Sequence, residues 1–316
     1  MILAADTDIW RFQAHPEVWL LIGGAIALAW YAVRVIGPNA VPPGTPIVTR
    51  RNKIAYVAAI GALWVASDWP MHDVSEEYLY SAHMLQHLII SFVVPPLLLV
   101  AMPEWLARLV MSSDGRAGVW IRRLSHPVAA GVTFNIVVAL THLTYIVNTS
   151  VEVGPFHYAV HTVVFLASMM MWIPVVGPVP ELRMGLGGQM VYLFLMSVIP
   201  TVPAGFLTFA DGALYDAYDH NVRLWGIGIS ADQQLAGFFM KIIGGMYLWT
   251  WIIVRFYQWS NATRGSTDMV LVTDDSGDDD DGETIPTFED ADGETDLTFE
   301  DVQAEFEAAG PAPSEA

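Results

Sequence analysis

The sequence of 316 residues contains no cysteine. This absence excludes disulfide bonds, thiolate metal sites, c-type haem attachment and iron–sulfur clusters. Any metal that the chain binds must therefore be held by histidine, methionine, carboxylate or backbone groups.

Basic residues are scarce as well. The chain has 14 Lys and Arg against 33 Asp and Glu, a formal net charge of −19. This acidic excess argues against a nucleic-acid partner, which would require a basic surface. Residues 257–316 hold 18 of the acidic residues and a single base, Arg264, so the rest of the chain is nearly neutral.

Hydrophobic residues make up 54% of the chain, and the mean hydropathy is +0.43, which is too apolar for an ordinary soluble fold. They fall into runs of about 20 residues, the length that crosses a hydrocarbon layer of about 30 Å. We therefore predict an all-α integral membrane bundle of about seven transmembrane helices. The predicted spans are Val18–Ile36, Ile54–Trp69, Ala82–Met102, Pro127–Val147, Tyr158–Val176, Gln189–Ala210 and Leu235–Phe256.

The connections between these runs are alternately rich and poor in basic residues. Eleven follow the first, third, fifth and seventh spans, and only Arg11 and Arg223 lie on the opposite side. The positive-inside rule then places the N-terminus outside and the C-terminus in the cytoplasm of a multi-pass plasma membrane protein. Residues 1–260 are predicted to form the transmembrane domain, in contact with lipid, and residues 261–316 a disordered acidic cytoplasmic tail.

With this orientation, eight of the nine histidines lie toward the outer side, and His126 is the exception. Two pairs are spaced by four residues, so the members of each pair share a helix face. Polar side chains inside a bilayer face the bundle interior, and several neutral imidazoles at one depth suit a transition metal. The predicted metal ligands are His83, His87, His142, His157 and His161.

Other polar residues stand near these histidines. Met84 offers a soft thioether ligand, and Asp232 could orient a ligating histidine, bind the metal itself or cap its own helix. His72 is a further possible ligand in the segment Met71–Tyr80, which we expect to be a solvated acidic loop. Interhelical hydrogen bonding is the structural alternative for all the histidines. Lys241, predicted to lie near the bilayer middle, is an unexplained intramembrane charge.

Several stretches resemble the CtaG family of cytochrome c oxidase assembly factors. They include Ser81-Ala-His83-Met-Leu-Gln-His87, the following Pro95-Pro96, His142, the His157/His161 pair and Asp232-Gln233-Gln234, and the match runs from about His15 to Trp251. The resemblance implies a seven-helix membrane protein that supplies copper to the oxidase from the outer side. Its implied partners are oxidase subunits and a copper donor protein. Thr144, where the family often has proline, and Lys241, where an aromatic residue is expected, depart from the pattern.

Two other functions compete with copper delivery. Histidines on facing helices could instead ligate haem b in an electron carrier. A retinal protein is disfavoured because the span Ala82–Met102 contains no carboxylate counter-ion. The sequence contains no nucleophile–base arrangement and no phosphate-binding glycine loop, so we do not expect an enzyme. Because imidazole must be neutral to ligate, metal binding should weaken below about pH 6.

Overall fold

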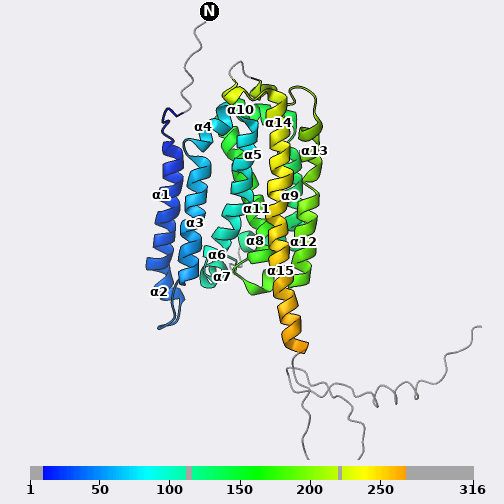
Figure 1. Cartoon of the computed structure of the whole chain (residues 1–316). Coiled ribbons are helices and arrows are strands. Elements are labelled where there is room, and N and C mark those ends of the chain that lie inside the picture. Colours follow the sequence, from blue (N-terminus) through cyan, green and yellow to red (C-terminus); the bar gives the residue numbers. More distant parts are fainter. Residues whose placement is uncertain (1–9, 112–115, 220–222, 268–316) are drawn as a thin grey trace, which may run out of the picture. The chain divides into compact units, whose positions relative to one another are not determined.

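The computed structural model describes residues 10–111, 116–219 and 223–267 (Figure 1). The chain divides into two compact units, Met1–Trp259 and Ser260–Ala316, and the first is described below. The predicted acidic tail lies outside the described residues except for residues 261–267, which are helical.

All regular structure in the described residues is helical. The α-helices are α1 (Pro16–Tyr31), α2 (Gly37–Ala40), α3 (Arg50–Ser67), α4 (Met71–Glu77), α5 (Tyr80–Leu88), α6 (Val94–Ala101), α7 (Glu104–Met111), α8 (Arg116–Leu124), α9 (Pro127–Thr141), α10 (Thr144–Glu152), α11 (Gly154–Val176), α12 (Leu186–Val198), α13 (Thr201–Phe209), α14 (Ile229–Phe238) and α15 (Gly244–Thr267). Three π-helical turns, Ala32–Ile36, Ile89–Val93 and Phe239–Ile243, join α1 to α2, α5 to α6 and α14 to α15. Short 3₁₀ turns occupy Pro180–Leu182, Asp216–Tyr218 and Leu224–Gly226.

Five helical segments in the described part of the chain are long and apolar enough to cross a membrane: Pro16–Ala40, Tyr80–Ala101, Gly154–Val176, Leu186–Phe209 and Ile229–Thr263. Two bent pairs raise the number to seven if each pair is one span. Arg50–Ser67 meets Met71–Glu77 at 41°, and Gly118–Leu124 meets Pro127–Thr141 at 82°. The prediction of an all-α chain is therefore confirmed, with five to seven helical segments long and apolar enough to span a membrane.

Two predicted segments differ from the structure. The predicted run Pro127–Val147 is interrupted, because α9 ends at Thr141 and His142 has φ −95° and ψ 0°, outside the helical region. The expected solvated loop at Met71–Tyr80 is wrong, since it contains α4, whose residues His72, Asp73 and Ser75 are buried.

The π turn between α5 and α6 follows from Pro95 and Pro96. Proline has no backbone N–H, so the carbonyl of Ser91, four residues before Pro95, has no partner within a regular helix. The indole Nε1–H of Trp172 on α11 donates to this carbonyl at 3.0 Å. Trp172 is fully buried in a core cluster that includes Phe92 and Phe134, so the irregular turn is tied to the core of the bundle.

The connections rich in basic residues meet at one end of the bundle (Figure 1). The indole of Trp105 donates to the carbonyl oxygen of Ile47 at 2.9 Å, which joins the connections after the first and third spans. The Arg108 guanidinium bonds the Glu181 carboxylate at 2.7 Å, which joins the connections after the third and fifth. These contacts place the three connections at one end of the bundle. That this end faces the cytoplasm stays a prediction.

Candidate metal centre

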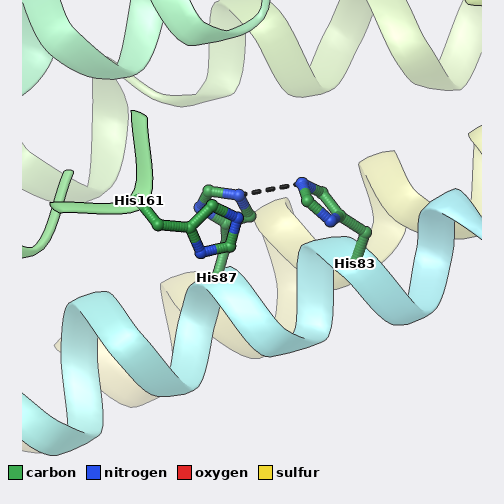
Figure 2. Close-up of side chains that lie close together, drawn as sticks. All are labelled: His83, His87 and His161. Atoms are coloured by element: carbon green, nitrogen blue, oxygen red, sulfur yellow. Dashed lines mark hydrogen bonds between the residues drawn. The ribbon is translucent and has the colours of Figure 1, made fainter. Parts of the chain in front are cut away.

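Three of the predicted ligands converge at the opposite end of the bundle. His83 and His87 stand one turn apart on α5, and His161 approaches them from α11 (Figure 2). One donor nitrogen from each lies within 4.8 Å of the other two. The Nε2 atoms of His83 and His87 are 2.9 Å apart, so one ring donates a hydrogen bond to the other.

This spacing fits a bound transition metal. Two nitrogens on one tetrahedral ion at about 2.0–2.1 Å are roughly 3.3 Å apart, so small side-chain movements would complete the set. The Nε2 atom of His161 and the Nδ1 atom of His83 are buried without a hydrogen-bond partner. Buried polar atoms are normally paired, and an ion would provide the missing interaction for His161.

Asp232 positions the helix that carries two of these ligands. Its carboxylate accepts hydrogen bonds from the backbone N–H groups of Tyr80 at 2.8 Å and Ser81 at 3.0 Å. The first N–H groups of a helix lack partners within it, and a negative charge there is favourable. Asp232 therefore caps α5 rather than its own helix, α14.

Gln86 links α5 to two neighbouring helices. Its Nε2 donates to the Ala66 carbonyl at 2.8 Å, and its Oε1 accepts from the Ser75 hydroxyl at 3.1 Å. These bonds attach one face of α5 to α3 and α4. His83 and His87 on the same helix approach His161 of α11 (Figure 2).

His157 lies beside the three convergent rings, and both of its nitrogens have partners. Its Nε2 is 2.6 Å from Glu76 Oε1, and its Nδ1 is hydrogen-bonded to the Ser150 hydroxyl at 3.2 Å. The ring centroid is 4.2 Å from that of His161. The Glu76 oxygen is also 3.2 Å from His72 Nδ1, so one carboxylate joins two histidines.

Sequence reasoning missed the role of Glu76, because α4 was expected to be a solvated loop. The available signal was the four-residue spacing of His72 and Glu76, which places both side chains on one face once the segment is helical. On the same helix, Asp73 pairs with His15 at 2.7 Å, and the His15 and His72 ring centroids are 4.6 Å apart.

His142 contributes a free nitrogen to the same region. Its Nδ1–H donates to the Val138 carbonyl at 2.7 Å, which leaves an unprotonated Nε2 that is buried without a partner. Two cavities of about 20 and 60 Å³ lie beside it, and both are also lined by Met84 and His87. The hydroxyl of Tyr215 donates to the His142 carbonyl at 2.9 Å and supports the turn between α9 and α10.

The remaining predicted residue lies apart from this cluster. The ammonium of Lys241, in the π turn before α15, donates to the Thr201 hydroxyl at 2.7 Å. His126 occupies the N-cap position of α9 and is exposed at the basic end, and His220 lies outside the described residues. The structure thus brings His83, His87 and His161 together and places His142 and His157 beside them. Ligation by any of the five stays a prediction.

Comparison with known proteins gives one match. A family model described as cytochrome c oxidase caa3 assembly factor, Caa3_CtaG, matches residues 29–262. No curated protein and no solved structure matches the chain. The matched region contains the three convergent histidines, His142, His157, Glu76 and Asp232.

Proposed function

Because the chain belongs to the Caa3_CtaG family of cytochrome c oxidase caa3 assembly factors, we propose that it binds copper through His83, His87 and His161 and delivers the ion to the oxidase. The observation that carries this proposal is the convergence of three imidazole nitrogens within 4.8 Å of one another. Copper is the cargo in this proposal, and the chain acts as a metallochaperone rather than as an enzyme.

The chemistry of the surrounding residues suits a copper ion. Imidazole binds copper well, and a thioether such as that of Met84 favours Cu(I). Met84 is buried and lines a cavity together with His83 and His142. His142 Nε2, unpaired in the same region, could provide a further ligand.

The depth of the site supports transfer. His83 and His87 lie about 5 and 10 Å along α5 from its first residue, at 1.5 Å per residue. His87 and His161 are only half-buried. Three protein ligands leave a fourth position open on a tetrahedral ion, so a ligand from a partner can bind before a histidine dissociates. The proposed partners are oxidase subunits, and a separate protein that supplies copper.

Copper titration of the purified chain in detergent tests the proposal. We expect tight binding of copper by the unaltered protein. Each of His83→Ala, His87→Ala and His161→Ala should weaken binding by about 100-fold, equivalent to about 2.7 kcal/mol.

His126→Ala is the matched control, because this exposed histidine lies at the other end of the bundle. It should bind copper as the unaltered protein does. Unchanged affinity in all three site variants would exclude this copper site.

The geometry disfavours the haem alternative. The rings of His87 and His161 have centroids 4.5 Å apart, which leaves no space for a porphyrin between them. The neighbouring cavities of about 20 and 60 Å³ are also far smaller than ordinary cofactor pockets of several hundred Å³. Protein purified from haem-replete cells should therefore lack a Soret band.

A further inference from the structure

Lys241 places a positive charge deep within an apolar span. It lies twelve residues after the start of the segment Ile229–Thr263, about 18 Å along it at 1.5 Å per residue. Its partner Thr201 is eight residues, or about 12 Å, from the end of the segment Leu186–Phe209. A charged side chain at this depth is costly and normally faces a partner or a water-filled cavity.

The described part of the chain does not neutralise this charge. No described carboxylate oxygen lies within 4.0 Å of the Lys241 ammonium. Asp232 is the only acidic residue in either of the two spans, and both of its oxygens bind the start of α5. The Thr201 hydroxyl accepts one hydrogen bond, but a neutral group leaves the charge uncompensated.

The two spans touch on either side of Lys241. Near Gly237, α13 and α14 are so close that a Cβ at this glycine would lie 2.5 Å from the Thr208 hydroxyl oxygen. Further along, Phe194 on α12 meets Trp249 on α15 with ring centroids 6.1 Å apart. Lys241 is exposed and lies between these two contacts along its span. The two spans run side by side (Figure 1).

Small residues recur at helical spacing along both spans, on either side of Thr201 and after Lys241. Ser197, Thr201 and Gly205 follow one another at intervals of four, and Gly245 lies four residues after Lys241. A Cβ added at Gly205 or Gly245 would have no atom within 4 Å, so both positions are open. Small residues of this kind allow the backbones of transmembrane helices to approach closely.

We propose that the open helix face carrying Ser197, Thr201, Gly205, Lys241 and Gly245 binds a transmembrane helix of another protein that carries an Asp or Glu near its middle. The carboxylate would pair with the Lys241 ammonium, and the small residues would admit the incoming backbone. A second copy of this chain does not fit, because its described spans carry acidic residues only near their ends. The proposal is independent of copper binding.

A membrane peptide provides the test. The probe is a leucine–alanine transmembrane peptide with one central Glu, compared with the same peptide carrying Gln. Energy transfer between the labelled peptide and the protein is measured in phosphatidylcholine vesicles. Because the chain lacks cysteine, Ala213→Cys, exposed in a connecting segment, supplies a unique dye position. We expect the Glu peptide to bind at least about tenfold more tightly than the Gln peptide, or about 1.4 kcal/mol.

Lys241→Met should abolish this preference, and Lys53→Met should keep it, since Lys53 is exposed near the start of α3. Gly245→Leu, which fills open space without touching the charge, should weaken binding of the Glu peptide and remains informative if Lys241→Met fails to fold. Equal binding of the two peptides to the unaltered protein, or a Glu preference that survives in Lys241→Met, would overturn the proposal.

Discussion

Glu76 joins the predicted metal ligands to a wider set of histidines. Its Oε1 lies 2.6 Å from His157 Nε2 and 3.2 Å from His72 Nδ1. Because the His157 ring packs at 4.2 Å from that of His161, the carboxylate limits how the neighbouring ligand can move. Carboxylates that hold histidines near a metal commonly influence affinity without contacting the ion.

Glu76→Gln should weaken copper binding by about tenfold, at the lower end of the range for residues that orient ligands. The amide keeps the shape of the side chain but loses the charge that holds the His157 imidazole. Copper competition with a colorimetric chelator measures the effect. Glu77→Gln is the matched control, since Glu77 is the exposed neighbour. If Glu76→Gln and Glu77→Gln bound copper with equal affinity, Glu76 would have only a structural role.

At the scale of the element, irregular backbone surrounds the histidines. The π turn Ile89–Val93 begins two residues after His87, and His142 occupies the turn between α9 and α10. π turns within α-helices are frequent at functional sites. Asp232 anchors the other end of α5 through the N–H groups of Tyr80 and Ser81.

Asp232→Ala should lower the free energy of unfolding by about 3 kcal/mol, because two buried N–H groups lose a charged acceptor. Asp232→Asn, which keeps one acceptor oxygen, should cost less. Denaturant unfolding in detergent, followed by circular dichroism, measures both.

The exposed Asp216 supplies the control variant Asp216→Ala, which should unfold as the unaltered protein does. If Asp232→Ala were as stable as this control, the contacts of Asp232 would not contribute to holding α5.

At the scale of the whole molecule, the basic connections and the histidine cluster occupy opposite ends of the bundle. The contact between Trp105 and the Ile47 carbonyl and the ion pair of Arg108 with Glu181 bring three basic connections together. The Arg108 guanidinium also keeps the pKa of the Glu181 carboxyl below its ordinary value. Excess Lys and Arg at one end favours retention of that end in the cytoplasm.

Single-cysteine labelling of intact cells tests this orientation. A membrane-impermeant maleimide should label Ala213→Cys from outside, because this residue lies in an exposed segment between the sixth and seventh spans. Asn39→Cys, exposed at the end of α2, should react only after permeabilisation. The opposite pattern would reverse the orientation and move the histidine cluster to the cytoplasmic side.

The sequence alone determined the all-helical, apolar character of the chain and named the candidate ligands, among them the three histidines that converge. Long apolar runs specify spans because unpaired backbone groups are too costly in hydrocarbon, and the four-residue spacing places His83 and His87 on one helix face. Only the tertiary structure decided that His161 completes the set, that His157 binds Glu76 and that Asp232 caps α5. These contacts join residues from separate helices. The rotation of each helix depends on packing across the whole bundle, and a local sequence pattern cannot predict that packing.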